Sequence, residues 1–333
     1  MKKHKTNSVL MLSEAGEGIG YGHFTRCLAI QQYLNQHHMP CTMLLYVNGK
    51  CADLNFSYIV NTNWHHASVG LKGYSKRFNT VIIDSYLASE NRLAYIRSLF
   101  RYVIAIDDYN RLVYPADLIL NLNTFFEDMD YRNQQGQTLG GQPYIPLRPA
   151  FISNLQKHTV KQQVHSVLIT LGGNDYRKLA PDLIRSLNNA YPDFQLHMIA
   201  GSNGYKEVLS RNMTGQHHIY GFLEVDSVVS LMLNADIVIS AAGQTLHELA
   251  YLGVPTIAIC VADDQRFNMK SYIHNRFLLE SLYWDDTGLM DRIIGVLSIM
   301  QEKTLRQRLS ENGKTIVDGK GLERIYCLLN DLG

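Results

Sequence analysis

The sequence predicts an α/β fold of two Rossmann-like domains, each built on a parallel sheet, with the two sheets facing a central cleft. Three observations lead to this fold class. The 333 residues exceed one ordinary domain, and 46% of them are hydrophobic, which is enough for two cores. Short apolar segments alternate with segments of helical spacing, as in sheets covered on both faces. The alternation lapses over residues 123–163 and restarts, so we predict domains at 1–150 and 160–315.

Ten short segments are predicted to be buried strands, because nearly all of their residues are apolar and many are β-branched. Five lie in each half, at residues 8–12, 41–47, 80–84, 102–107, 117–121, 166–171, 194–200, 219–223, 236–240 and 256–260. Several of them run directly into acidic or glycine-rich residues. Ligands of parallel α/β sheets bind at that carboxyl edge, so the loops there are the first places to look for function.

Most of the segments that follow these strands carry apolar residues at helical spacing. The predicted helices are residues 24–34, 91–101, 179–190, a stretch ending near 209, 225–233 and 246–252, with further helical patterning at 305–309 and 325–332. No short-period repeat interrupts this order.

Composition and charge exclude several classes of protein. Lys and Arg number 31 against 30 Asp and Glu, so no basic field supports nucleic-acid binding. The apolar run at 8–12 is too short for a signal-peptide core or a membrane span. The sequence contains no C-x-x-C pair, so it indicates neither a disulfide framework nor a structural zinc site. A reducing cytoplasm fits this cysteine pattern best. The five cysteines are Cys27, Cys41, Cys51, Cys260 and Cys327.

A glycine-dense loop at residues 16–23 follows the first predicted strand. It does not fit the dinucleotide fingerprint, because Tyr21 and His23 occupy positions that need glycine, so NAD is disfavoured. Gly20 and Gly22 let a ligand approach the backbone. His23 has two interpretations: a proton acceptor from water, or a helix-start residue held by solvent and backbone. Arg26 is most simply a helix-surface charge, although it could pair with a nearby acid.

Two junctions in the second half could hold an anion. Gly172 and Gly173 end a buried strand, but such a turn also serves as a plain connection to a helix. At residues 240–248 small residues precede a helix, whose N-terminus suits a diphosphate. There Glu248 could accept ribose hydroxyls, or it could be a first-turn acid favoured by the helix dipole.

Other polar residues are predicted to have structural roles. His247 and Glu248 are adjacent on one helix and do not share a face, so no metal site is predicted there. The histidine pairs at 37–38, 65–66 and 217–218 are interpreted as solvated loop residues. Strand-end acids more often cap the next helix than act in chemistry. These acids are Asp84, Asp107 and Asp108.

Six segments in order resemble one enzyme family: GYGHFTRCL at 20–28, IDSY at 83–86, IDDYNR at 106–111, YIPLRPAF at 144–151, LGGND at 171–175 and AAGQTLHELA at 241–250. Together they resemble the UDP-2,4-diacetamido-2,4,6-trideoxy-altropyranose hydrolases of pseudaminic acid biosynthesis, over about residues 8–275. Spore-coat polysaccharide biosynthesis proteins share the glycine-histidine loop. The resemblance implies a GT-B-like fold in which the last residues, 316–333, pack back on the first domain.

The resemblance also implies an activity. A UDP-linked diacetamido-trideoxy sugar would be hydrolysed by water attack at the anomeric carbon, with inversion and with no metal or cofactor. The alternative is a glycosyltransferase of surface polysaccharide biosynthesis on the same scaffold. The partner would be a UDP-sugar, with neither nucleic acid nor membrane insertion.

Individual roles follow from the matched motifs. His23 would activate or orient the water, Tyr86 would lie beside the sugar, and Arg148 would approach the substrate. Glu248 would hold the ribose. The remaining binding residues would be Ala242, Gly243, Gln244 and Thr245 at the diphosphate, Phe222 and Leu223 at uracil, and Asp264 and Gln265 at the sugar. The chain departs from the family pattern at Ser13-Glu14, where an Arg and an Asp are common, and at Asp264, where an Asn is common.

Overall fold

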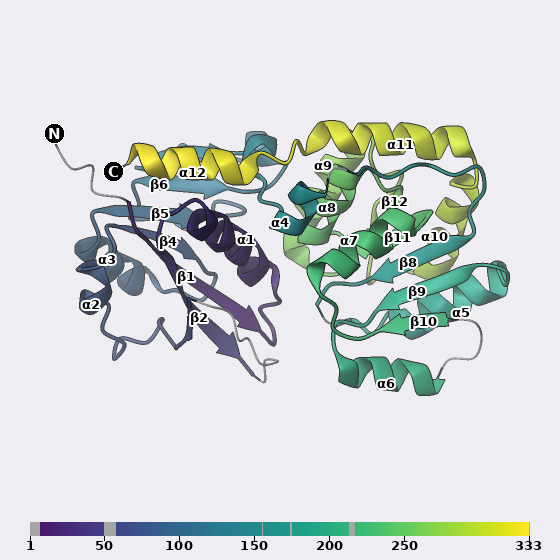
Figure 1. Cartoon of the computed structure of the whole chain (residues 1–333), viewed down its shortest axis with the longest axis horizontal. Coiled ribbons are helices and arrows are strands. Elements are labelled where there is room, and N and C mark those ends of the chain that lie inside the picture. The colour runs from purple at the N-terminus through teal and green to yellow at the C-terminus, as the bar shows by residue number, and fades with distance from the viewer. Residues whose placement is uncertain (1–6, 50–57, 155, 174, 213–216, 333) are drawn as a thin grey trace. The chain divides into compact units, whose positions relative to one another are not determined.

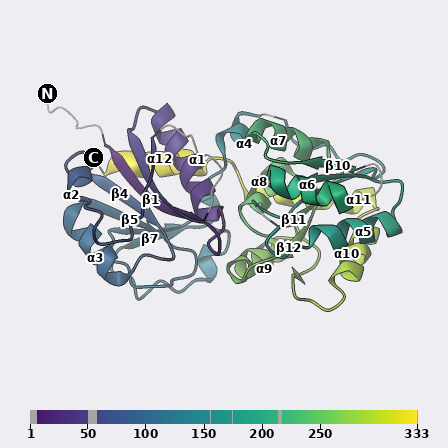
Figure 2. The same cartoon turned by 90° about the horizontal axis from the view of Figure 1, so that it is seen from below.

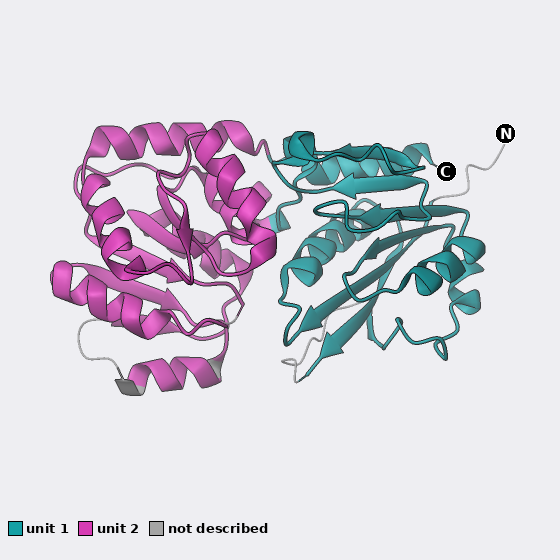
Figure 3. Cartoon of the chain, turned by 180° about the vertical axis from the view of Figure 1, so that it is seen from behind, with its two compact units in different colours: residues 1–149, 319–333 teal, residues 150–318 magenta. Residues whose placement is uncertain are grey.

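The computed structural model describes residues 7–49, 58–154, 156–173, 175–212 and 217–332. The chain divides into two compact units (Figure 3). Unit 1 comprises Met1–Pro149 and Gly319–Gly333, and unit 2 comprises Ala150–Asp318. Cys51 and Asn174 lie outside the described residues. The four described cysteines are free thiols.

Unit 1 is built on a seven-stranded parallel sheet with the order β3-β2-β1-β4-β5-β6-β7. Its interior strand β1 is buried along its whole length, as expected for a sheet covered on both faces. The strands are β1 (Val9–Gly16), β2 (Cys41–Asn48), β3 (Ile59–Asn61), β4 (Thr80–Asp84), β5 (Tyr102–Ile106), β6 (Leu118–Asn121) and β7 (Gln137–Gly140).

The helices of unit 1 come from both ends of the chain. They are α1 (Gly22–Gln36), α2 (Lys72–Ser75), α3 (Glu90–Leu99), the short 3-10 helices η1 (Phe126–Asp128) and η2 (Gln142–Tyr144), and α12 (Gly321–Asp331). The last helix, α12, contacts α1 and η2 (Figure 1). At its end, the Leu329 carbonyl accepts a hydrogen bond from the Asn7 side chain. The C-terminal residues therefore complete the unit that the N-terminal residues begin.

Unit 2 has a six-stranded parallel sheet with the order β10-β9-β8-β11-β12-β13. Its strands are β8 (Ser166–Thr170), β9 (Gln195–Ile199), β10 (His217–Tyr220), β11 (Ile237–Ala241), β12 (Thr256–Cys260) and β13 (Leu282–Tyr283). Its core is formed by apolar residues of these strands and of the helices beside them, among them Ile169, Leu183 and Ile239.

Among the helices of unit 2, α11 packs on α8 and α10 packs on α5. Figure 2 shows α5 and α10 side by side. The helices of this unit are α4 (Pro149–Ser153), which begins on the last residue before the unit, α5 (Ala180–Ala190), α6 (Asn203–Asn212), α7 (Val225–Asn234), α8 (Gln244–Leu252), the short η3 (Asp263–Gln265), α9 (Arg266–His274), α10 (Leu289–Ile299) and α11 (Lys303–Ile316).

Each sheet has one point at which the chain reverses its direction of winding. In unit 1 the chain moves from β1 outward to β2, and later from β4 outward in the opposite direction to β5. In unit 2 the corresponding neighbours are β8 and β11. Because crossovers between parallel strands are right-handed, the helices after these two strands cover opposite faces and leave a crevice at the carboxyl ends. Each unit thus has one such reversal point, the place where parallel α/β sheets usually bind ligands.

The two parallel sheets confirm the predicted fold class, but some predicted elements were wrong. Strand β7 lies within the segment that we read as turns, because it is a half-exposed edge strand with one large apolar residue, Leu139. His217 and His218, predicted to be loop residues, start β10. Within the part of the chain that the structure describes, no helix has the length and apolar character needed to cross a membrane.

The contact between α12 and η2 predicts the effect of one substitution. A Cβ at Gly321 would lie 2.1 Å from the Ile145 carbonyl oxygen, whereas one at Gly295 in α10 would meet no atom within 4 Å. We expect Gly321→Ala to lower the free energy of unfolding by about 1–3 kcal/mol through forced displacement of backbone. Gly295→Ala should raise it by up to about 1 kcal/mol, because alanine favours helix. Urea unfolding of both variants measures this, and equal stability would contradict the packing of α12.

Candidate functional site

The reversal point of unit 1 lies between the neighbouring strands β1 and β4 (Figure 1). Several buried polar side chains come from the segments at this point. His23 stands in the first turn of α1, Asp84 ends β4, and Asp108 follows β5. All three are buried. A parallel sheet brings these carboxyl ends to one edge, so residues far apart in sequence meet there.

His23 forms a close pair with Asp84. The distance from its Nδ1 to Asp84 Oδ1 is 2.6 Å, and the histidine is 5% exposed. Burial lowers the pKa of His23, but the charge of Asp84 and its hydrogen bond outweigh burial and leave that pKa raised. Arg26 Nη2 also lies 3.1 Å from Nδ1, but the Asp84 oxygen is closer. The carboxylate can only accept a proton from a neutral ring at Nδ1, so the tautomer with the lone pair on Nε2 is favoured. His23 is therefore held by a carboxylate rather than by solvent and backbone.

Arg26 ties two carboxylates together. Its Nε and Nη2 each donate to Asp84 at 2.7 Å, and its Nη1 and Nη2 donate to Asp108 at 2.7 and 2.9 Å. Burial raises the pKa of Asp84 and of Asp108, but the Arg26 charge overrides it and lowers both. The interpretation of Arg26 as a surface charge was wrong, since the residue is 7% exposed. It lies three residues after His23 and hence on the same face of α1.

Tyr86 is fixed at both of its ends. Its hydroxyl donates to Asp108 and its backbone N–H donates to Glu14 Oε1 at 2.7 Å. Its ring meets the His23 imidazole edge-on, with centroids 4.3 Å apart. Asn123 donates to the other Asp108 oxygen at 2.6 Å. Tyr86 thus covers the imidazole in one defined position.

Glu14 holds the loop that carries Tyr86. It is fully buried, and it accepts hydrogen bonds from the Ser85 hydroxyl and, at 2.9 Å, from His65 Nε2. Burial raises the pKa of Glu14, but its bonds to His65, Ser85 and Tyr86 leave it lowered. The prediction that His65 is a solvated loop residue was wrong. The carboxylate at this departure from the family pattern has a positioning role.

The glycine loop leaves room next to His23. A Cβ at Gly20 or Gly22 would meet no atom within 4 Å, so these residues border open space. Gly16 differs, because a Cβ there would lie 2.1 Å from the Asn48 carbonyl oxygen and its φ is +116°. Gly16 is needed for the fold, whereas Gly20 and Gly22 leave the backbone accessible to a ligand.

In unit 2 the predicted diphosphate residues gather at the end of β11. Ala242 is buried, and the N-cap of α8 is Gly243, which has no side chain to cap the helix. Gln265 lies beside the start of α8. Its Oε1 accepts a hydrogen bond from the Val261 N–H at 3.0 Å, and its Nε2 lies 3.3 Å from the position that a Cβ on Gly243 would take. Gln244 and Thr245 form the half-buried first turn. A helix N-terminus preceded by small residues suits an anion.

Glu248 lies one turn into α8 and is 1% exposed. The alternative that it is a first-turn acid was wrong, because α8 begins at Gln244 and has no acid in its first turn. Asp264 is exposed beside Gln265, within η3. His247 is buried, and its Nδ1 lies 2.6 Å from the Tyr272 hydroxyl, which accounts for it without a metal.

The other predicted binding residues of unit 2 lie on neighbouring loops. Gly172 and Gly173 follow β8 with φ of +88° at Gly172, and both are at least partly exposed. Asp175 accepts hydrogen bonds from Leu179 N at 2.9 Å and Ala180 N at 2.8 Å, so this turn also serves as a helix connection.

Three predicted residues remain. Phe222 is 63% exposed and Leu223 is half-buried, both between β10 and α7. Arg148 is half-buried at the end of the first segment of unit 1, after η2.

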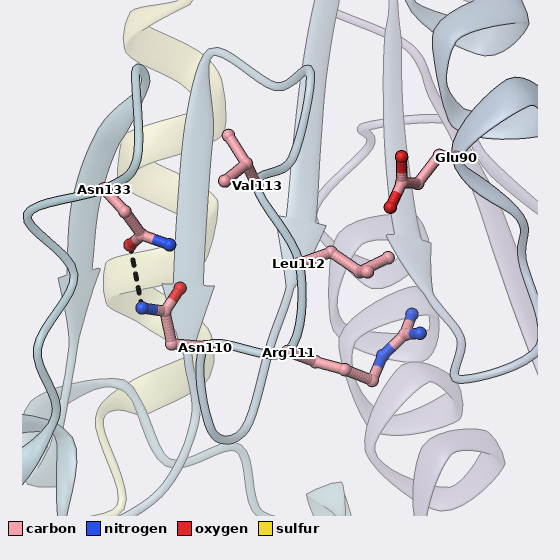
Figure 4. Close-up of a pocket in the computed structure, with 6 residues that line it drawn as sticks. All are labelled: Glu90, Asn110, Arg111, Leu112, Val113 and Asn133. Atoms are coloured by element: carbon pink, nitrogen blue, oxygen red, sulfur yellow. Dashed lines mark hydrogen bonds between the residues drawn. The ribbon is translucent and has the colours of Figure 1, made fainter.

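A pocket of about 380 Å³ lies elsewhere on unit 1 and contains none of the predicted residues (Figure 4). It is lined by Glu90, Asn110, Arg111, Leu112, Val113 and Asn133. Arg111 links this pocket to the residues around His23, because its Nη2 donates a hydrogen bond to the Ser85 carbonyl at 3.1 Å. Among the described residues no group of three or more His, Cys, Asp or Glu could hold a metal ion.

The comparisons with known proteins agree with this architecture. Residues 166–315 match the model of the glycosyltransferase family 28 C-terminal domain. The chain is 23% identical over 344 residues to the spore coat polysaccharide biosynthesis protein SpsG of Bacillus subtilis, with 97% of each chain covered. It is 24% identical over 257 residues to the pseudaminic acid cytidylyltransferase and UDP-2,4-diacetamido-2,4,6-trideoxy-beta-L-altropyranose hydrolase of Helicobacter pylori, covering 76% of this chain and 44% of that protein.

Solved structures show the same fold. Acinetobacter baumannii MurG superposes with a TM-score of 0.64 at 16% identity, over 98% of this chain and 99% of that one. The glycotransferase of kitacinnamycin also gives a TM-score of 0.64, at 13% identity and the same coverage. The GT-B-like fold class is thereby confirmed.

The geometry around Asp84 predicts a change in the titration of His23. In the wild type, NMR should give a His23 pKa above the usual value of about 6.5. In Asp84→Asn the attraction is lost, so the pKa should fall below the wild-type value. Asp130→Asn, which removes an exposed acid paired with Arg132, should leave it unchanged. A His23 pKa that is equal in wild type and Asp84→Asn would show that the pair does not form.

Proposed function

We propose that the protein is a glycosyltransferase-like enzyme of surface-polysaccharide biosynthesis that transfers a sugar from UDP to an acceptor hydroxyl. The observation that carries the proposal is the buried His23, whose Nδ1 is bound to Asp84 and whose Nε2 is left to accept a proton. The match of residues 166–315 to a glycosyltransferase domain supports it, as does the similarity to SpsG over nearly the whole chain. The free thiols fit a cytoplasmic enzyme.

Unit 1 would supply the base. As the acceptor oxygen attacks the anomeric carbon, its proton passes to His23 Nε2. The bond between that carbon and the phosphate oxygen breaks, and UDP leaves with the electron pair. The resulting imidazolium is stabilised by Asp84, which is already ionised because Arg26 lowers its pKa. Tyr86 would lie against the sugar and limit its position.

Unit 2 would bind the UDP portion. The first turn of α8, from Gly243 to Thr245, offers backbone N–H groups to the diphosphate. Glu248 would accept the ribose hydroxyls, and the exposed Phe222 would stack on uracil. Asp264 and Arg148 would contact the sugar side of the substrate.

Hydrolysis is the second candidate, and the same site would perform it with water as the acceptor. Six ordered segments and the relative from Helicobacter pylori favour it. The sequence alone placed hydrolysis first. The relative whose match covers 97% of both chains is named for polysaccharide biosynthesis, however, and the domain model is that of a glycosyltransferase. Transfer to an acceptor therefore has support at least as broad as that for hydrolysis.

One assay separates the two reactions. The protein is incubated with UDP-2,4-diacetamido-2,4,6-trideoxy-altrose or UDP-N-acetylglucosamine, and free UDP is followed with and without a bacterial surface-glycan extract as acceptor. UDP release that needs the extract supports transfer. Release from the altrose derivative without any acceptor supports hydrolysis and overturns transfer as the principal reaction.

The base assignment predicts a loss of rate without a loss of binding. His23→Ala should lower kcat by about 10²–10⁴-fold, the usual contribution of a general base. UDP affinity measured by calorimetry should stay unchanged, because the UDP-binding residues belong to unit 2. The control His66→Ala removes an exposed histidine and should keep full activity. Full turnover by His23→Ala would refute the assignment.

The ribose assignment predicts a loss of binding. Glu248→Gln should raise the Kd for UDP about tenfold or more, because a charged acceptor of two hydroxyls is replaced by a neutral one. Glu302→Gln, an exposed acid next to α11, should leave the Kd unchanged. Equal affinities for the wild type and Glu248→Gln would remove Glu248 from the binding site.

A further inference from the structure

Arg177 is a cation at the carboxyl edge of the sheet in unit 2. It lies in the loop between β8 and α5, and its Nε donates to the Val261 carbonyl at 2.9 Å. Its guanidinium lies 3.6 Å from the centroid of the Trp284 ring and 5.0 Å from that of Tyr176. In the described parts of the chain, no Asp or Glu pairs with it. Its terminal nitrogens Nη1 and Nη2 thus keep their hydrogen-bonding capacity.

Three other arginines of this unit are paired with acids. Arg266, at the start of α9, binds Asp263 at 2.8 Å, and Arg185 in α5 binds Asp182 at 2.9 Å. Arg292 is bound by two acids. Arg177 differs from them, since aromatic rings and a carbonyl oxygen hold it in place and leave its charge without a counterion.

These contacts also orient the guanidinium. Stacking on Trp284 fixes the plane of the group, and the bond from Nε to Val261 fixes its rotation within that plane. Neither terminal nitrogen is among the buried polar atoms without a partner, so both reach solvent. A guanidinium held in this way offers two parallel N–H donors, and its side chain loses little further conformational entropy when a ligand binds. Such a group suits bidentate binding of phosphate.

Two hydrogen bonds connect Arg177 to Gln265, which lies beside the start of α8. Val261 accepts from Arg177 through its carbonyl and donates through its N–H to Gln265, whose amide faces Gly243. Arg177 comes from the loop after β8, which is the neighbour of β11 at the reversal point of the sheet. The cation and the N-terminus of α8 therefore belong to the same edge.

We infer that Arg177 is a further binding residue of this site and that its Nη1 and Nη2 donate to the phosphate oxygens of a nucleoside diphosphate. The inference rests on the proposed function, because the ligand is the leaving group of that reaction. The proposed reaction gives Arg177 no other role. The cation would hold the negative charge of the released diphosphate together with the N–H groups of α8.

The test compares ligands with and without phosphate. Arg177→Gln should raise the Kd for UDP about tenfold or more, as expected when charged hydrogen bonds are lost, and leave that for uridine unchanged. Arg177→Lys, which keeps the charge without the fork, should give a smaller rise. The matched control Arg185→Gln removes one positive charge from α5 and should change neither Kd. Calorimetry gives the affinities, and thermal unfolding without ligand gives the Tm of each variant.

Two results would overturn the inference. One is an unchanged UDP affinity in both Arg177 variants. The other is an equal weakening of UDP and uridine with a lowered Tm, which would show that Arg177 only holds the loop. Failure of the proposed function looks different, because wild-type protein would then not bind UDP. If Glu248→Gln weakens UDP binding and Arg177→Gln does not, only the role of Arg177 is wrong.

Discussion

The candidate site depends on one buried guanidinium shared by two carboxylates. Arg26 binds Asp84 and Asp108 at 2.7–2.9 Å, and without it two ionised acids would be buried close together. A buried charge without a partner costs several kcal/mol or changes its protonation state. Because Arg26 keeps both acids ionised, Asp84 can hold the Nδ1 proton of His23 and Asp108 can hold the hydroxyl of Tyr86. Arg26 is thus the common cause of the protonation state of His23 and of the position of the Tyr86 ring beside it.

The topology explains why such groups occur where they do. In each unit the chain reverses its winding between two neighbouring parallel strands, β1 and β4 in unit 1 and β8 and β11 in unit 2. The chemistry differs between the two positions. Unit 1 gathers a histidine, an arginine and carboxylates, which suits proton transfer. Unit 2 offers a glycine N-cap, a buried Glu248 and the unpaired charge of Arg177, which suits an anionic nucleotide.

Much of the fold could be predicted from the sequence, because buried parallel strands are nearly uniform in composition. The predicted strand at 80–84 coincides with β4, whereas the short edge strands β3, β7 and β13 were missed, since half-exposed strands carry no clear apolar pattern. His23 stood out because it ends a glycine loop. Arg26 did not, because a charge on an amphipathic helix has the same spacing whether a carboxylate or solvent faces it. The useful signal was present in Asp84 and Asp108: two acids that end adjacent buried strands require a cation.

The central claim is that the imidazole of His23, held by Asp84, takes the proton in the reaction. The most direct measurement is the pH dependence of kcat/KM for UDP release, compared with the NMR titration of His23 in the same free enzyme. The account predicts that kcat/KM rises with pH as His23 loses its proton, with one apparent pKa, above about 6.5, common to both curves. An activity that rises at a different pH from the titration of His23, or that does not depend on pH across that titration, would contradict it.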